Sequence, residues 1–391
     1  MMNKQQADPP SLPIWIAPME GLTLAIFRRI WAKHFGCGLV EKYYTPFLNA
    51  NHTLHFQGKE IRDILPENNA GMHVVPQILT NKPDQLAWAV GEMVHYGYDE
   101  VNFNLGCSMP QVARKKRGAG MLGDPDALDR FFEEFFELLE RGEYHPQGSQ
   151  MEAAVEESAE KKPATKEATQ GKLASHAARA VRISVKTRIG LDDRSTADRL
   201  IAIYNRYPFD SIIIHPRLQC EIYSGEPDME AFARMYEESV HPVVYNGDIL
   251  RPEDDQRIRT QFPRLRAVMI GRGILRDPSL VRQIACLAAQ SSPGSPGDDP
   301  AGPTGRPPGK ATAQEIRAFH DELLDAYINC YRDEHQALSK MKELWWYMRD
   351  FFPQQERIIK KMRKCTSLDR YRAYAVELFT AEEASATISE K

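Results

Sequence analysis

Short apolar segments alternate with amphipathic helical segments along residues 1–290, and this alternation restricts the fold more than any other feature. Eight segments are predicted to be strands, at residues 14–17, 39–47, 73–79, 101–106, 181–186, 212–215, 243–245 and 267–270. Strands separated by helices pair in parallel through right-handed crossovers. Eight such units over roughly 250 residues favour an α/β fold of the (β/α)₈ TIM-barrel type. A doubly wound open sheet is the structural alternative.

Two stretches of biased composition divide the chain. Residues 146–178 are predicted to be a flexible insertion, because most of this segment is rich in Glu, Lys, Ala and Ser and too poor in apolar residues to order itself. Residues 291–310 are dense in Pro and Gly, which predicts a linker. We therefore expect a barrel domain over residues 1–290 and a small all-α domain over residues 311–391.

The composition restricts the partners and the compartment. The chain has 391 residues and a net charge of −4, so any affinity for nucleic acid must come from a local patch. No apolar run approaches membrane-spanning length and the N-terminus is polar, so we expect no membrane segment or signal peptide. The six cysteines lack paired spacing, which indicates reduced thiols and no metal site. We expect a cytoplasmic protein that acts as a monomer.

The predicted strand at residues 101–106 delivers a single thiol, Cys107. Apolar residues alternate with Asn102 and Asn104 along this strand, and Gly106 permits a turn before the cysteine. A basic, glycine-rich loop with Arg-Lys-Lys-Arg at residues 114–117 follows. A lone cysteine in an apolar strand is more often a packed core residue, but these neighbours favour an active site that faces an anionic group.

Nearly every predicted strand ends in hydrogen-bonding or charged residues, as expected at the catalytic end of a barrel. These residues are Pro18, Met19, Gln77, Asn104, Lys186, Arg188, His215, Arg217, Asn246, Gly247, Asp248, Gly271 and Arg272. The glycine-rich ends of the seventh and eighth strands predict a phosphate site. Lys186 is expected to place a positive charge beside a cofactor ring, because a lysine in an apolar strand needs a partner.

Residues 14–285 resemble the FMN-dependent tRNA-dihydrouridine synthase family. The motifs that carry the resemblance are Ala17-Pro18-Met19-Glu20-Gly21, Pro76-Gln77-Ile78, Asn104-Leu105-Gly106-Cys107, Gly118-Ala119-Gly120-Met121-Leu122, Val185-Lys186-Thr187-Arg188-Ile189-Gly190, His215-Pro216-Arg217, Asn246-Gly247-Asp248 and Gly271-Arg272-Gly273. Their order is also the family's order. Two residues depart from the usual pattern, Ser108 after the cysteine and Pro216 after the histidine, and they leave loop shape and the choice of target uridine open.

The resemblance implies reduction of the C5=C6 bond of a tRNA uridine, with NADPH as the reductant. Hydride from reduced FMN would reach C6, and Cys107 would be the general acid that protonates C5. A thiol with a pKa of about 8.5 is mostly protonated at neutral pH. Asn104 and Arg188 would face the uracil or its phosphate. The residues that would hold FMN are Pro18, Met19, Gln77, Lys186, His215, Asn246, Gly247, Asp248, Gly271 and Arg272.

The resemblance implies that the predicted helical domain binds tRNA, and an excess of basic residues between 340 and 372 agrees with that role. Together with Arg114 in the active-site loop, Lys360, Lys361 and Arg363 are expected to contact tRNA. The large aromatic residues nearby, Trp345, Trp346 and Phe351, are predicted to be core.

Two other functions remain open at this stage. A flavin barrel that reduces a small free pyrimidine or enone would explain the barrel motifs but not the basic C-terminal segment. An RNA-binding protein that has lost catalysis would explain that segment, and the presence of Cys107, Lys186 and His215 argues against it.

Overall fold

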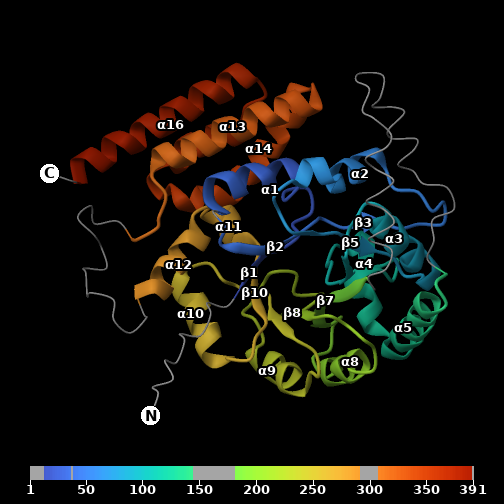
Figure 1. Ribbon diagram of the computed structural model, residues 1–391. Coiled ribbons are helices and arrows are strands. Elements are labelled where there is room, and N and C mark those ends of the chain that lie inside the picture. The colour runs from blue at the N-terminus through green and yellow to red at the C-terminus, as the bar shows by residue number, and fades with distance from the viewer. Residues whose placement is uncertain (1–12, 37, 144–180, 291–306, 390–391) are drawn as a thin grey trace, which may run out of the picture. The chain divides into compact units, whose positions relative to one another are not determined.

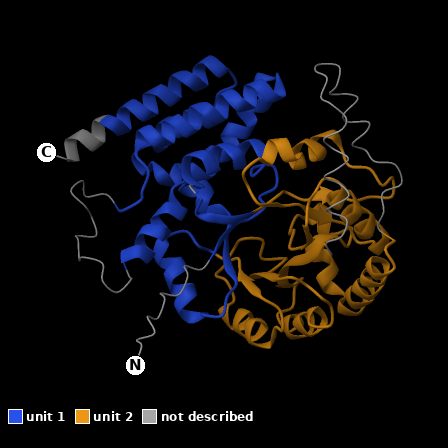
Figure 2. Ribbon diagram, viewed as in Figure 1, with its two compact units in different colours: residues 1–42, 248–391 blue, residues 43–247 orange. Residues whose placement is uncertain are grey.

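The computed structural model describes residues 13–36, 38–143, 181–290 and 307–389, and Figure 1 shows their helices and strands. The chain divides into two compact units, which Figure 2 colours separately. Unit 1 contains residues 1–42 and 248–391, and unit 2 contains residues 43–247. The predicted insertion at 146–178 lies outside the described residues, as does most of the predicted linker at 291–310. The predicted division into a barrel domain and a helical domain remains a prediction.

Unit 2 is built on a parallel sheet. Its strands are neighbours in the order β3, β5, β6, β7, β8, β9, and all of these pairs are parallel. The end of β2 pairs in parallel with β4. The bounds are β2 (Val40–Tyr44), β3 (Leu48–Asn49), β4 (Val74–Val75), β5 (Gln77–Leu79), β6 (Glu100–Leu105), β7 (Arg182–Gly190), β8 (Ile212–Leu218) and β9 (Val243–Tyr245). β6 and β8 are buried along their whole length, as is typical of a parallel sheet.

The helices of unit 2 connect these strands. They are α2 (Gly58–Ile64), α3 (Pro83–His95), α4 (Pro110–Ala113), α5 (Pro125–Glu140), α8 (Thr196–Tyr204) and α9 (Met229–Glu238), with 3₁₀ turns at Pro66–Asn69 and Gly118–Gly123. Asp124 caps α5, whose apolar face packs on β6. Phe103 stacks on Phe131 at 5.2 Å and meets Phe132 edge-on at 6.0 Å. This packing fixes the strand that ends at Cys107.

Unit 1 combines the strands β1 and β10 with helices, and it also contains 3₁₀ turns at Arg349–Phe351 and Pro353–Gln355. β1 (Ile14–Ile16) pairs in parallel with β10 (Ala267–Ile270). The first helices are α1 (Ala25–Trp31), which continues as a π-helix (Ala32–Gly36), α10 (Pro252–Gln261), α11 (Arg272–Arg276) and α12 (Leu280–Gln290). The C-terminal helices are α13 (Ala313–Tyr331), α14 (Glu334–Met348), α15 (Glu356–Lys364) and α16 (Leu368–Ser389).

The C-terminal helices have their own core and also contact α1. Within that core, the hydroxyl of Tyr371 lies 2.8 Å from Nε2 of His320 and accepts a hydrogen bond of 2.7 Å from Trp345. Phe319 of α13 packs edge-on against Phe27 of α1 at 6.0 Å. Lys340 of α14 donates to the backbone carbonyl of Gly21 at 2.8 Å. The C-terminal helices are therefore part of the same unit as β1 and β10.

Parallel strands alternate with helices and are followed by α13–α16, so the predicted class, a (β/α)₈ TIM barrel with C-terminal helices, is confirmed. The predicted strands 243–245 and 267–270 have the observed bounds, whereas Pro76 divides the predicted strand 73–79 into β4 and β5. The N-cap of α1 is Leu24, and the Thr23 hydroxyl before it accepts from the N–H of Met19. None of the described helices has the length and apolar character needed to cross a membrane.

Candidate active site

Polar side chains on neighbouring strands of unit 2 lie in register. The register pairs Asn104 of β6 with Lys186 of β7, and Arg188 of β7 with His215 of β8. Residues in register on paired strands project to the same side of the sheet. Four predicted site residues are therefore neighbours on one side of this sheet.

The turn that carries Cys107 is held by Asn104. The side-chain oxygen of Asn104 accepts hydrogen bonds from the backbone N–H of Gly106 at 3.0 Å and of Cys107 at 2.9 Å. An asparagine that binds the backbone two and three residues ahead stabilises a tight turn. Arg188 holds the same turn from β7, because its Nε donates to the carbonyl of Gly106 at 3.0 Å. The half-buried thiol of Cys107 is thus presented by a turn that two neighbouring strands fix.

The basic loop is packed directly against Cys107. The N–H of Ala119 donates to the carbonyl of Cys107 at 3.2 Å. Gly118 has φ of +55°, and a Cβ there would lie 3.0 Å from Cβ of Cys107. A Cβ at Gly120 would lie only 2.3 Å from the carbonyl oxygen of Ala113. The glycines of this motif therefore let the loop with residues 114–117 approach the turn closely.

Lys186 places an ammonium group beside the turn. A Cβ on Gly106 would lie 3.7 Å from Nζ of Lys186. Burial and then the positive charge of Arg188 lower the pKa of Lys186 to about 7, while the interaction with Cys107 acts in the opposite direction. The ammonium group is therefore close to Cys107 and easily deprotonated in the free protein.

Arg188 is a buried residue with structural contacts. Only 1% of its surface is exposed, and Nη1 and Nη2 donate to the carbonyls of Leu218 and Ile222, both at 2.7 Å. Burial lowers the pKa of Arg188 to about 10. These bonds tie β7 to the loop after β8, and the predicted contact of Arg188 with the substrate remains a prediction.

His215 lies against Arg217, two residues further along β8. Nη1 of Arg217 is 3.2 Å from Nε2 of His215. Because a guanidinium can only donate, Nε2 of His215 accepts this bond and its proton lies on Nδ1. Arg217 also donates to the carbonyl of Gly225 at 2.7 Å. The pair gives this strand end a positive charge next to a neutral N–H donor.

Gln77 is fully buried between two asparagines. Its Nε2 donates to the side-chain oxygen of Asn102 at 2.7 Å, and its Oε1 accepts from Nδ2 of Asn104 at 2.6 Å. These contacts fix the orientation of the Gln77 amide. The predicted role of Gln77 in cofactor binding remains a prediction.

The end of β9 requires a residue without a side chain. A Cβ at Gly247 would lie 2.0 Å from the hydroxyl of Tyr245. Asn246 before it is buried, and its N–H donates to the carbonyl of Ile214 at 2.9 Å. The backbone of this turn is therefore held in place by β8, and Gly247 lets it approach Tyr245.

In unit 1, the turn after β1 is closed by Thr23. The N–H of Met19 donates to the Thr23 hydroxyl at 2.8 Å, and the carbonyl of Met19 accepts from the backbone of Leu22 at 2.9 Å. Pro18 and Met19 are half-buried. The turn is thus set by local bonds.

Asp248 and Arg272 of unit 1 form an ion pair with each other. Gly271 lies close to the turn after β1, because a Cβ there would be 3.2 Å from Sδ of Met19. Within unit 1, four of the predicted cofactor residues therefore form one cluster at the ends of β1 and β10.

A comparison with known protein families identifies the family of this chain. The family model described as Dihydrouridine synthase (Dus) matches residues 15–140 and 169–390. The chain belongs to the dihydrouridine synthase family. A curated relative, tRNA-dihydrouridine synthase B of Pasteurella multocida (strain Pm70), is 25% identical over 280 residues, which are 71% of this chain and 70% of the relative. The tRNA-dihydrouridine(16) synthase of Neisseria meningitidis serogroup B is 22% identical over 383 residues, 96% of this chain and 98% of the relative.

The family assignment confirms the predicted family and the predicted class of enzyme, an oxidoreductase. Most of the dihydrouridine synthase motifs quoted from the sequence fall in the second halves of strands or in the loops that follow them, and the motif at residues 118–122 forms a 3₁₀ turn.

The basic loop of this dihydrouridine synthase has charges without acidic partners. Arg114, Lys115 and Lys116 are exposed and Arg117 is half-buried. Across the described part of the chain, no carboxylate lies within ion-pair distance of these four residues. The loop thus carries a net positive charge beside Cys107.

The C-terminal helices carry a second basic surface, centred on an aromatic residue. Trp346 is 48% exposed, and the guanidinium carbons of Arg349 and Arg363 lie 4.0 Å and 4.4 Å from its ring centroid. The prediction that Trp346 is core was wrong, whereas Trp345 is fully buried. Both are large apolar residues, but successive helix positions point about 100° apart, so only one of them faces the core.

The predicted basic residues of α15 differ in their partners. Lys360 pairs with Glu356 at 2.8 Å and Lys361 with Glu377 at 3.3 Å. Arg363 has no carboxylate within ion-pair distance among the residues that the structure describes. Of the three, Arg363 has the charge most available to a phosphate.

The sequence did not predict a role for three polar residues that precede the predicted site residues on β6 and β7, Glu100, Asn102 and Ser184. Each is buried and hydrogen-bonded to another of the three. Their alternation with apolar residues was visible in the sequence, but their mutual contacts depend on the register of two strands that lie far apart in the chain.

Proposed function

We propose that this dihydrouridine synthase reduces uridine in tRNA to 5,6-dihydrouridine, with FMN as bound cofactor and NADPH as reductant. The observation that carries the proposal is the turn at Cys107, which Asn104 and Arg188 hold beside the ammonium group of Lys186. The family assignment supports it, as does the similarity to relatives that are named tRNA-dihydrouridine synthases.

The donor set fits FMN. Lys186 offers a positive charge to an electron-rich ring, and the glycine-containing turns that follow β9 and β10 offer backbone N–H groups, which bind phosphate in many proteins. His215 adds an Nδ1–H donor. The residues that would hold FMN are Pro18, Met19, Gln77, Lys186, His215, Asn246, Gly247, Asp248, Gly271 and Arg272. When bound, reduced FMN would supply hydride to C6 of the uracil.

Cys107 would donate its proton to C5 as general acid. The carbon–hydrogen bond forms with the proton that leaves sulfur, and a thiolate remains. Lys186 and Arg188 stabilise that thiolate, because both interact electrostatically with Cys107. Asn104 keeps the thiol in position through the backbone N–H of Cys107.

A tRNA substrate would meet both basic surfaces. The loop with residues 114–117 would contact phosphates near the target nucleotide. Lys360, Lys361 and Arg363 would contact phosphates from the helical domain, and exposed Trp346 adds a ring on which a base or a sugar can pack. A base in a tRNA loop leaves its stack at low cost, which suits an enzyme that works on its C5=C6 bond.

The experiment is a comparison of Cys107→Ala with Cys220→Ala. Both thiols belong to unit 2, but Cys220 is exposed and lies in the loop after β8. We expect Cys107→Ala to retain FMN, measured by flavin absorbance, and to lose at least about 100-fold in turnover on a tRNA transcript. Cys220→Ala should keep full turnover. Undiminished turnover of Cys107→Ala would exclude the general-acid role.

The proposal also concerns which uridine of the tRNA is reduced. The relative that aligns over nearly its whole length is named for position 16, so position 16 is the first uridine to examine. Equal activity on free uridine would instead favour an enzyme for small pyrimidines.

A further inference from the structure

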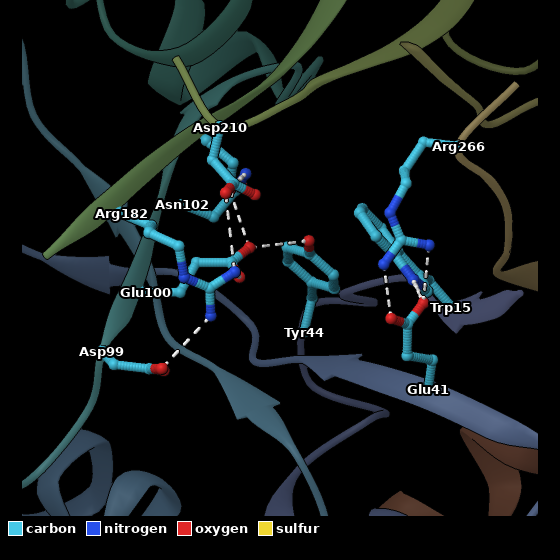
Figure 3. A network of polar contacts seen from close by, with 10 residues as sticks. Trp15, Glu41, Tyr44, Asp99, Glu100, Asn102, Arg182, Asp210 and Arg266 are labelled. Atoms are coloured by element: carbon cyan, nitrogen blue, oxygen red, sulfur yellow. Dashed lines mark hydrogen bonds and ion pairs between the residues drawn. The ribbon is translucent and has the colours of Figure 1, made fainter. Parts of the chain in front are cut away.

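A continuous chain of buried hydrogen bonds runs from a carboxylate deep in unit 2 to the turn that carries Cys107. Starting from Glu100, it passes through Ser184, Asn102 and Gln77 to Asn104, and each of these side chains is buried. We call these five residues the polar chain. Figure 3 shows its deep end, with Glu100 and Asn102 beside Tyr44 and Arg182.

Glu100, the carboxylate at the start of the polar chain, determines which group donates and which accepts in every hydrogen bond of the chain. A carboxylate can only accept, so the hydroxyl of Ser184 donates to Glu100 at 3.3 Å. The Ser184 oxygen is then left to accept from Nδ2 of Asn102 at 2.9 Å. Asn102 must consequently turn its oxygen toward Gln77, whose Nε2 donates to it at 2.7 Å.

The same logic continues to the active-site turn. Oε1 of Gln77 accepts from Nδ2 of Asn104 at 2.6 Å, which directs the oxygen of Asn104 toward the N–H groups of Gly106 and Cys107. If the amides were reversed, the NH₂ group of Asn104 would face those N–H groups. Two buried donors would then oppose each other, which costs about 1–3 kcal/mol per unsatisfied group.

Two further donors, Arg182 and Tyr44, bind the carboxylate of Glu100. Its Oε2 lies 2.9 Å from Nη1 of Arg182, and its Oε1 accepts from the hydroxyl of Tyr44 at 3.3 Å. Burial, and then the charge of Glu100, raises the pKa of Tyr44 well above its usual value, so the phenol stays protonated and donates. Arg182 also pairs with Asp99 and Asp210 at 3.3 Å and 3.5 Å.

We propose that Glu100, Ser184 and Asn102 are positioning residues that fix the amide of Asn104 through Gln77 and thereby hold the turn of Cys107 in its productive conformation. This inference rests on the role of Cys107 given above, because the turn matters for catalysis only if its thiol reacts. Neither Glu100 nor Ser184 needs to touch substrate or cofactor for this role, because both act through the amides above them.

The main test removes the hydroxyl of Ser184. Ser184→Ala breaks the link between Glu100 and Asn102 and deletes one buried oxygen. Ser211→Ala is the matched control, because Ser211 is equally buried in unit 2 and its hydroxyl lies outside the polar chain. We expect Ser184→Ala to lower kcat on tRNA about tenfold with little change in KM, since a small misplacement of a reacting group slows chemistry more than binding.

A second measurement does not depend on turnover. The rate at which iodoacetamide alkylates Cys107, read by mass spectrometry of the Cys107 peptide, reports the environment of the thiol directly. Ser184→Ala should change this rate about threefold or more relative to the wild type, and Ser211→Ala should not. Melting curves identify any variant that fails to fold.

Glu100→Gln provides the second variant. An amide at this position can donate as well as accept, so the polar chain loses its fixed direction while its volume is retained. We expect the same changes in kcat and alkylation rate as in Ser184→Ala. Wild-type kcat and alkylation rates in both folded variants would overturn the proposal. If Cys107→Ala were fully active, the general-acid role would fail, whereas the alkylation rates would still decide whether the polar chain positions the turn.

Discussion

The side-chain oxygen of Asn104 accepts a hydrogen bond of 2.9 Å from the backbone N–H of Cys107, so the strand end and the thiol are fixed by one side chain. Asn104→Ala should therefore leave two backbone N–H groups without this acceptor. We expect a loss of about 2 kcal/mol in the free energy of unfolding, together with a lower kcat. Urea denaturation and turnover on tRNA measure the two effects. Unchanged kcat in the folded variant would show that the turn does not need this bond.

Gly118 should tolerate alanine poorly because of its contact with Cys107. Gly118 has φ of +55° and Gly142 has φ of +70°, but a Cβ at Gly142 meets nothing within 4 Å. Both substitutions cost about 1 kcal/mol in backbone strain. Only Gly118→Ala also pushes on Cys107, so it should lower both stability and kcat more than Gly142→Ala. Equal effects of the two variants on kcat would argue against the contact.

The charge of Lys186 should make stability depend on pH. The pKa of Lys186 is about 7 in the folded protein against 10.5 for the ordinary side chain. Between these values the unfolded chain binds the extra proton, so this residue makes the free energy of unfolding rise as pH increases from about 7 to 10 and disfavours folding below 7. Cofactor-free Lys186→Met should therefore melt above the wild type at pH 6, and the difference should shrink at pH 10. A difference that does not depend on pH would contradict the lowered pKa.

Arg363 should contribute more to tRNA binding than Lys360. Arg363 packs on Trp346 and has no acidic partner among the described residues, whereas Lys360 already pairs with Glu356. We expect Arg363→Glu to weaken tRNA binding more than Lys360→Glu and to reduce the salt dependence of binding. Fluorescence anisotropy at several salt concentrations measures both. Equal effects of the two reversals would place the RNA contact elsewhere on the C-terminal helices.

The sequence predicts the elements of this protein better than their contacts. Apolar runs with clear ends, such as residues 243–245, predict their strands with the observed bounds. β7 and β8 are longer than predicted, because their polar ends continue the strands. The guanidinium group of Arg188 makes this possible, since its donors are satisfied by the backbone carbonyls of Leu218 and Ile222. The sequence of one strand does not predict which carbonyls of another segment accept hydrogen bonds from its buried arginine.

The sequence predicts which strand ends carry the candidate site, but it does not predict the hydrogen bonds between their side chains. Cys107 was recognisable from its turn and its basic loop. The link between Ser184 and Asn102 was not, because it depends on the register of β6 and β7. The exposure of Trp346 depends likewise on the phase of α14, which two adjacent tryptophans leave ambiguous.

The most direct test maps dihydrouridine in tRNA from cells that lack this protein, complemented with the wild type or with Cys107→Ala. The account predicts that dihydrouridine disappears from at least one tRNA position, returns with the wild type and does not return with Cys107→Ala. An unchanged dihydrouridine map in the cells that lack the protein would contradict it.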